Sequence, residues 1–301
     1  MNVLNLEGIV PPLITPFTNT GEVYEEGLRR LLDFQVAKGT HALFMCGTYG
    51  SGPLMSTEDR KQVATITVDQ INGKIPIIVQ VGTPSSGQTL ELARHAQDIG
   101  ADAVASVPPF YYTYDEAAVA QYFQSLVDAV DLPVFIYNNP QTSGFNLTPE
   151  FLVRLVELGV KGIKDSCFSF VQFTHYLNAL GTCPEFCYMM GTETLFLPAL
   201  MLGVKSCIVA LGNTYPELVI DLFNAFRDKN YNQAATLQLK ATQVREKLYI
   251  APTPYSACYS ILRWRGIDVG VPKPPMLPAS REQEEHLKAA FQNLGLPVTP
   301  E

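Results

Sequence analysis

The sequence predicts a (β/α)8 TIM barrel with a C-terminal helical extension. The chain has 301 residues, and one such barrel takes about 250. Short apolar runs recur along the chain with amphipathic helical patterns between them, which favours parallel strands joined by right-handed crossovers. An open doubly wound sheet would usually carry a glycine fingerprint after its first strand, whereas here that strand is followed by TPFTNTGE.

Eight apolar runs are the expected strands. Each is short, and most are rich in β-branched or other apolar residues, as strands buried on both faces should be. The runs are PPLIT (11–15), ALFMCG (42–47), PIIVQVG (76–82), AVASVPP (103–109), PVFIYN (133–138), GIKDS (162–166), CYMMG (187–191) and CIVALG (207–212).

The segments between these runs carry helix signals. Residues 23–37 show a mainly apolar stripe at helical spacing, and Ser56 is a plausible N-cap with acidic residues in the turn that follows. Thr148 is the expected cap of another helix, with Pro149 at its first position and Gly159 past its last turn.

The predicted division places the barrel in residues 1–214. Residues 215–301 hold the last barrel helix and the helical extension, in which a Pro-rich connector precedes the final helix. The expected helices of this part are 215–228, 233–248, 254–265 and 281–294.

Composition and charge exclude several classes of function. A net charge of -8 argues against nucleic acid as a partner, because binding it needs clustered Lys and Arg. No apolar run reaches about 18 residues, so no membrane partner is expected. The N-terminus lacks a basic region followed by an apolar one, which favours a cytoplasmic protein. None of the six cysteines forms a CxxC pair, so we expect buried free thiols and no metal site.

In a barrel of this kind, the active-site residues lie at the C-terminal ends of the strands. The sixth run ends in Lys164, whose side chain is costly to bury unless it is paired or neutral. It would either form an ion pair with Asp165 or another acid, or be an amine whose pKa is lowered by burial so that it attacks a carbonyl. Lys161 lies at the start of the same strand and should face the opposite, structural end.

Neighbouring strand ends add further candidates. The fifth run ends in Tyr137, which should lie close to Lys164 and could move protons. The glycine-rich turn at 47–53 would expose N–H groups suited to a carboxylate or phosphate. The aromatic cluster at 108–114 is typical of packing or of an interface.

Together these motifs resemble a known family. GTYG, PPFYY, YNNP and GIKDS stand in the order and spacing of the dihydrodipicolinate synthase and N-acetylneuraminate lyase family of pyruvate aldolases. The resemblance runs from PPLITPF to PKPPMLP and so covers almost the whole chain.

The resemblance implies a role for each matching residue. Lys164 matches the Schiff-base lysine and Tyr137 the tyrosine of the YNxP motif. Thr48 and the N–H of Tyr49 match the pocket for the pyruvyl carboxylate, and Tyr111 matches a tyrosine that crosses a subunit interface. The family implies a homotetramer built as a dimer of dimers, with neither a metal nor an organic cofactor.

The positions at which the sequence departs from the family pattern limit which substrates of the family are expected. Synthases of the lysine pathway usually carry an Arg where Thr142 stands, and a neutral side chain cannot replace a bidentate guanidinium. Tyr49 and Ser51 also depart from the usual carboxylate turn. The motifs are most similar to archaeal-type 2-keto-3-deoxygluconate aldolases. GTET at 191–194 matches a site for sugar hydroxyls, so Gly191, Glu193 and Thr194 are expected there, although Glu193 and Thr194 equally suit a helix N-terminus.

The predicted function is therefore a metal-independent class I aldolase. It would cleave a 2-keto-3-deoxy sugar acid to pyruvate and an aldehyde, so that its partners are small 2-keto acids and aldehydes. Alternatives within the family are N-acetylneuraminate lyase, 4-hydroxy-tetrahydrodipicolinate synthase and 2-keto-3-deoxy-acid dehydratase. The alternative of another class is a catalytically silent, ligand-binding barrel.

Overall fold

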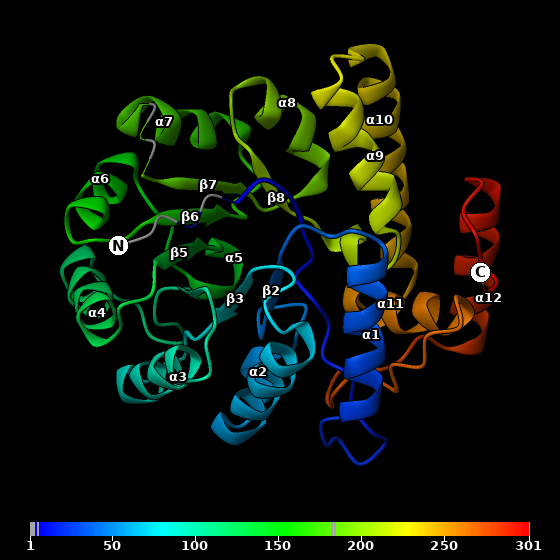
Figure 1. Cartoon of the computed structure of the whole chain (residues 1–301), viewed down its shortest axis with the longest axis horizontal. Coiled ribbons are helices and arrows are strands. Elements are labelled where there is room, and N and C mark those ends of the chain that lie inside the picture. The colour runs from blue at the N-terminus through cyan, green and yellow to red at the C-terminus, as the bar shows by residue number, and fades with distance from the viewer. Residues whose placement is uncertain (1–3, 5, 182, 184, 301) are drawn as a thin grey trace.

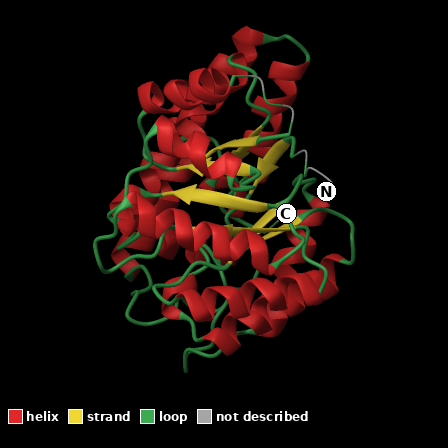
Figure 2. Cartoon of the chain, turned by 90° about the vertical axis from the view of Figure 1, so that its left-hand side faces the viewer, coloured by secondary structure: helices red, strands yellow, loops and turns green. Residues whose placement is uncertain are grey.

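A barrel of eight parallel strands forms the centre of the computed structural model, which describes residues 4, 6–181, 183 and 185–300. Helices surround the strands on the outside (Figures 1 and 2), so the predicted (β/α)8 fold is confirmed. The strands are β1 (Gly8–Val10), β2 (Leu43–Met45), β3 (Ile77–Gln80), β4 (Ala103–Ser106), β5 (Val134–Asn138), β6 (Gly162–Asp165), β7 (Cys187–Met190) and β8 (Ser206–Ile208).

The first strand lies before its predicted position. The expected strand at 11–15 is wrong, because regular pairing with β8 ends at Val10. Pro11 and Pro12 have no N–H to donate, so they cannot continue a ladder on both sides. They close the barrel instead: Pro12 forms a single parallel bridge with Phe44 of β2, and the Phe44 N–H donates to the Pro11 carbonyl at 3.0 Å.

Two of the helices that alternate with the strands begin at the caps that the sequence predicts, and the helix expected at 23–37 begins at Glu25. The side chains of Ser56 and Thr148 accept hydrogen bonds from the third N–H of the helices that they cap. Gly159 follows the second of these helices with a φ of +106°. The helices are α1 (Glu25–Ala37), α2 (Thr57–Ile71), α3 (Ser86–Asp98), α4 (Glu116–Ala129), α6 (Pro149–Glu157), α7 (Phe170–Leu180), α8 (Phe196–Met201) and α9 (Pro216–Arg227), with the short α5 (Pro140–Ser143) directly after β5.

Three further helices gather at one side of the barrel (Figure 1). They are α10 (Tyr231–Lys247), α11 (Pro254–Trp264) and α12 (Arg281–Asn293). Short 3₁₀ helices lie at η1 (Gly52–Leu54), η2 (Glu193–Leu195), η3 (Ala210–Asn213) and η4 (Leu248–Ile250). Among the residues that the structure describes, no helix combines the length and the apolar character needed to cross a bilayer.

The strands separate two apolar clusters. The larger cluster lies between the strands and the helices and includes Ile136 and Ile163. The smaller one fills the barrel interior and includes Phe44, Met189 and Ile208. Since side chains alternate along a strand, the residues that follow Ile136 and Ile163 point into the barrel.

The turn after β2 is held by close backbone contacts. Gly52 lies so near the chain before it that an added Cβ would stand 1.9 Å from the Cys46 carbonyl oxygen. The Gly52 N–H donates to the Gly47 carbonyl at 3.0 Å, and the Thr15 hydroxyl donates to the Gly50 carbonyl at 2.8 Å. The shape of the turn therefore depends on a residue without a side chain at position 52.

Gly52→Ala should destabilise the fold, because its Cβ meets backbone that cannot move aside without shifting the turn. A forced shift of this kind costs about 1–3 kcal/mol. Gly87→Ala is the matched control: Gly87 lies exposed in α3 with only the Ser85 hydroxyl oxygen near its added Cβ, at 3.9 Å, and this change should be neutral or stabilise by up to about 1 kcal/mol. Urea unfolding of both variants measures the difference. Equal stabilities would contradict the assigned contact.

Candidate active site

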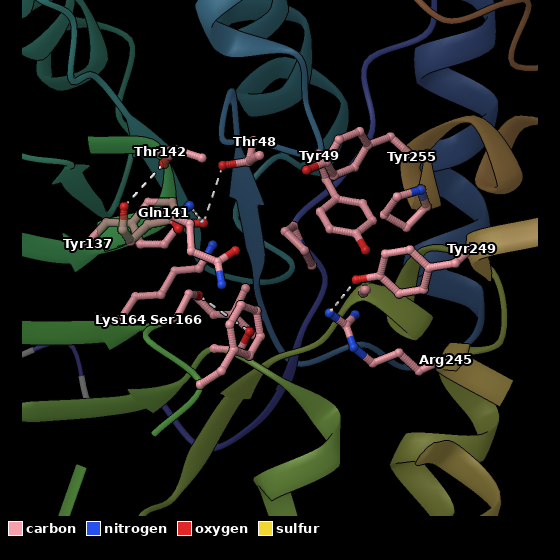
Figure 3. A pocket seen from close by; sticks show the side chains of 17 residues that line it. Thr48, Tyr49, Tyr137, Gln141, Thr142, Lys164, Ser166, Arg245, Tyr249 and Tyr255 are labelled. Atoms are coloured by element: carbon pink, nitrogen blue, oxygen red, sulfur yellow. Dashed lines mark hydrogen bonds between the residues drawn. The ribbon is translucent and has the colours of Figure 1, made fainter. Parts of the chain in front are cut away.

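Lys164 and Tyr137 stand side by side at the ends of neighbouring strands. They are direct partners in the parallel register of β5 and β6, so both side chains point into the barrel. Figure 3 shows them on one side of a pocket at the C-terminal end of the strands. The predicted proximity of these two residues is therefore present in the structure.

The Lys164 amine is buried among aromatic rings. Its side chain is 3% exposed, and its Nζ lies 4.0 Å from the centre of the Phe44 ring and 3.8 Å from that of Tyr137. No carboxylate of the described chain lies within ion-pair distance of Nζ. Burial lowers the pKa of Lys164, although the neighbouring Tyr137 opposes that change. The neutral amine required of a nucleophile is thus favoured.

The alternative ion pair with Asp165 does not form, because Asp165 faces the outside of the barrel. Its Oδ1 accepts a hydrogen bond of 2.7 Å from the Asn138 amide, and the Cys167 thiol donates to its Oδ2 at 3.0 Å. The same Asn138 amide donates to the Tyr176 hydroxyl at 3.2 Å. This buried network joins the ends of β5 and β6 and α7, which fixes the two strand ends from behind.

The Tyr137 hydroxyl is held by two polar side chains. The Asn139 amide donates to it at 3.1 Å, and the Thr48 hydroxyl lies 3.3 Å from it. Burial would raise the pKa of Tyr137, but Lys164 and the hydroxyls of Thr48 and Ser166 outweigh that effect and lower it. A phenol in this environment is suited to take and return a proton.

The turn at 47–50 leaves two backbone N–H groups beside the pocket without a backbone partner. Thr48 and Tyr49 both line the cavity, and no backbone acceptor of the described chain takes the N–H of either residue. Adjacent N–H groups of this kind favour an anion. The geometry is compatible with the predicted carboxylate site.

Apolar side chains close the barrel beneath the amine. Met189 is the partner of Lys164 in the register of β6 and β7, on the opposite side from Tyr137. Phe44, Met189 and Ile208 belong to the interior cluster and are buried. We call these three residues the floor of the pocket.

The wall opposite Lys164 combines Tyr49, which the sequence predicts near the substrate, with three residues that no sequence motif marks. It consists of Tyr49, Arg245 at the end of α10, Tyr249 of η4 and Tyr255 of α11, and we call it the distal wall (Figure 3). The rings of Tyr49 and Tyr255 meet edge to face with their centres 4.6 Å apart. No motif marks Arg245, because an Arg in the last turn of an amphipathic helix is usually a solvated charge.

Other predicted residues divide between the pocket and its surroundings. Gly191 and Thr142 line the pocket. Glu193 does not: it is buried behind the wall, 3.5 Å from Arg245, and its Oε1 accepts from the Leu211 N–H at 3.2 Å. Thr194 pairs its hydroxyl with that of Thr192 at 3.0 Å. Glu193 and Thr194 are therefore not among the residues that line the pocket.

Tyr111 lies outside the pocket of its own chain. It is 88% exposed and has a left-handed backbone with a φ of +83°. Its ring packs edge to face on Tyr112, with 5.3 Å between the ring centres. A role for Tyr111 in catalysis stays a prediction that requires a second copy of the chain.

Asn139, Ser166 and Gln141 also line the pocket and had no assigned role in the sequence. Asn139 is the second Asn of the YNNP motif and directly follows the last residue of β5. Its position in that motif, two residues after Tyr137, is a signal that could have identified it. Gln141 and Ser166 likewise follow strand ends, at β5 and β6, but single polar residues there are too common to be distinctive.

Comparison with known proteins agrees with this geometry. The model of the dihydrodipicolinate synthetase family matches residues 5–294. A 4-hydroxy-tetrahydrodipicolinate synthase from Desulfotalea psychrophila is 30% identical over 291 residues, covering 96% of this chain and 97% of that protein. The probable 2-dehydro-3-deoxy-D-pentonate aldolase YjhH of Escherichia coli is 32% identical over 300 residues, covering 97% and 98%.

A solved structure shows the same likeness in three dimensions. The crystal structure of YagE, a prophage protein of the dihydrodipicolinic acid synthase family from E. coli K12 in complex with pyruvate, superposes with a TM-score of 0.93. It is 29% identical and the match covers 96% of this chain and 99% of that one. The chain therefore belongs to the dihydrodipicolinate synthetase family and is a class I carbon–carbon lyase.

Proposed function

We propose that the chain cleaves a 2-keto-3-deoxy sugar acid to pyruvate and an aldehyde through a Schiff base on Lys164. The observation that carries this proposal is the buried Lys164 amine, which has no carboxylate partner among the described residues and lies against Tyr137. A desolvated, neutral lysine is the nucleophile that iminium chemistry requires.

The reaction begins when the Lys164 amine attacks the ketone carbon of the substrate. Tyr137 gives its proton to the departing hydroxyl group, which leaves as water, and an iminium ion results. The Tyr137 phenolate then takes the proton of the C4 hydroxyl, and the electrons of the C3–C4 bond move into the iminium. The aldehyde and the enamine of pyruvate result. Protonation of the enamine at C3 and hydrolysis of the iminium release pyruvate and restore the amine.

The turn at 47–50 holds the substrate carboxylate during these steps. The N–H groups of Thr48 and Tyr49 are fixed before the substrate arrives, so they stabilise its charge without reorganisation. The Thr48 hydroxyl also touches that of Tyr137 at 3.3 Å, which links the carboxylate site to the proton shuttle.

The lining of the pocket favours a sugar acid over an amino aldehyde. The alternative substrate, aspartate semialdehyde, is an aldehyde that carries an ammonium group. No Asp or Glu is among the described residues that line this pocket, so an ammonium would lose its water without gaining a carboxylate. Hydroxyl groups find partners in Thr142, Gln141 and Ser166.

We also propose that the active form is a homotetramer in which Tyr111 completes a neighbouring site. Its exposed ring and left-handed backbone support this, because strain at an exposed aromatic residue is often kept for a function.

Lys164 should form the covalent adduct with pyruvate. Borohydride reduction in the presence of pyruvate followed by peptide mass spectrometry will locate it. Lys161, at the other end of β6 and only partly buried, is the internal control and should stay unmodified. Label on Lys161 would overturn the assignment of the nucleophile. Label on no lysine would favour a ligand-binding barrel and overturn the proposed function.

Tyr137→Phe should keep the fold and the pyruvate adduct but lose turnover by roughly 10²–10⁴-fold, because it removes a positioned proton shuttle. Steady-state cleavage of 2-keto-3-deoxygluconate measures the loss, and borohydride trapping in the variant shows that the pocket still binds pyruvate. Turnover within a few-fold of the native protein would remove Tyr137 from proton transfer.

Adduct formation should rise with pH and level off above the pKa of Lys164. The amine attacks only when neutral, and burial places its pKa below the ordinary value of 10.5, so the midpoint should lie below that value. Tyr137 raises the pKa of Lys164, so the midpoint of Tyr137→Phe should lie lower still. Rapid-quench trapping of pyruvate across pH measures both. An upward shift in the variant would contradict the assigned coupling.

A further inference from the structure

The distal wall carries a guanidinium into the pocket. Arg245 extends from the end of α10 and faces the cavity opposite Lys164 (Figure 3). Its side chain is 13% exposed, so its charged group is largely shielded from solvent. A charged group in such a position lowers the free energy of binding for an anion.

The guanidinium is fixed on one side and open on the other. Its Nη1 lies 3.5 Å from Oε2 of Glu193, and its Nη2 donates to the Tyr249 hydroxyl at 3.4 Å. Glu193 is itself 1% exposed and held by the Leu211 N–H. Burial alone would lower the pKa of Arg245, but Glu193, Tyr49 and Tyr249 raise it. Arg245 is therefore charged throughout the working pH range and cannot turn far from its place.

Two hydroxyls beside Arg245 can donate into the same space. The Tyr249 hydroxyl accepts from Arg245, which leaves its own proton available. The Tyr49 hydroxyl is buried and makes no hydrogen bond within 3.5 Å to a described residue, although Arg245 lies near enough to interact with it. Burial raises the pKa of Tyr49, so the hydroxyl keeps its proton. An unpaired buried hydroxyl is costly unless a ligand pairs with it.

We propose that Arg245, Tyr249 and Tyr49 bind a carboxylate at the end of the substrate remote from Lys164. The inference rests on the proposed function and specifies its substrate class: a 2-keto-3-deoxy acid with a second, terminal carboxylate, which yields pyruvate and an aldehyde acid. In the reverse direction, the enamine carbon of pyruvate bonds to the aldehyde carbon, Tyr137 returns its proton to the new alkoxide, and water releases the product.

The neighbouring Glu193 favours a carboxylate over a phosphate. One buried negative charge already lies 3.5 Å from Arg245. The terminal carboxylate of the substrate would add one more negative charge on the side of Arg245 that faces the pocket. The guanidinium would then contact two carboxylates, which its several N–H donors can accommodate. A phosphate dianion would add a further charge close to Glu193 with no other cation of the distal wall to offset it.

The test compares aldehydes that differ only at the far end. Pyruvate is condensed with glyceraldehyde, with tartronate semialdehyde, in which a carboxylate replaces the CH2OH group, and with glyceraldehyde 3-phosphate. The native protein should show the highest kcat/KM with tartronate semialdehyde. The ratio to follow is kcat/KM for tartronate semialdehyde divided by kcat/KM for glyceraldehyde. Arg245→Gln should lower this ratio by about 10–200-fold, the usual range for one pocket contact.

Two further variants separate binding from folding. Arg245→Gln leaves Glu193 buried without its cation, so Glu193→Gln/Arg245→Gln removes both charges and should show the same fall in the ratio. Arg281→Gln changes an arginine of α12 whose side chain is 94% exposed, and it should leave the ratio as in the native protein.

The outcomes distinguish the two proposals. If borohydride traps no pyruvate on the native protein, the proposed function fails. If the adduct forms but glyceraldehyde is preferred, or if the double variant keeps the native ratio, only the distal carboxylate site fails. Preference for glyceraldehyde 3-phosphate would overturn the choice of a carboxylate and assign the site to phosphate.

Discussion

Keeping an amine buried and unpaired is the constraint on which the rest of the site depends. A lysine among aromatic rings would relax toward water or a carboxylate if its strand could move. The hydrogen bonds of Asn138 with Asp165 and Tyr176 hold the strand ends from the outer side, and the apolar cluster between strands and helices presses on the same face. The environment proposed to make Lys164 reactive thus rests on packing outside the pocket.

The parts of the protein that follow from local pattern were predictable. Alternating apolar runs and capped helices gave the barrel, and strand-end positions gave Lys164, Tyr137 and the turn at 47–50. The first strand was misplaced because PPLIT reads as an apolar run, while its prolines restrict pairing. Arg245 was missed because its environment is set by tertiary packing: α10 brings it to a pocket whose other residues lie far away in sequence. The sequence leaves Glu193 open between a sugar ligand and a helix N-terminus for the same reason, since nothing local reveals that it lies 3.5 Å from Arg245.

The pocket has two halves with different supports. Strands β2, β5 and β6 carry the lysine, the tyrosine and the carboxylate turn, and their geometry is fixed by the ladder of the barrel. The C-terminal helices carry Arg245, Tyr249 and Tyr255 of the distal wall, whereas Tyr49 comes from the turn after β2. In the proposed reaction, changes in these helices alter which aldehyde fits while Lys164 and Tyr137 stay in place. One fold can host several activities in this way.

The floor of the pocket also determines the order in which the two products leave in the proposed reaction. Phe44, Met189 and Ile208 belong to the apolar cluster that fills the barrel interior, so in the proposed reaction molecules reach the amine through the pocket, a passage lined by Tyr49, Arg245 and Tyr255. Once the C3–C4 bond is broken, the aldehyde stands in that passage, between the enamine and solvent. The water that frees pyruvate arrives along the same passage. The aldehyde therefore leaves first, and the enamine is shielded from water until it has gone.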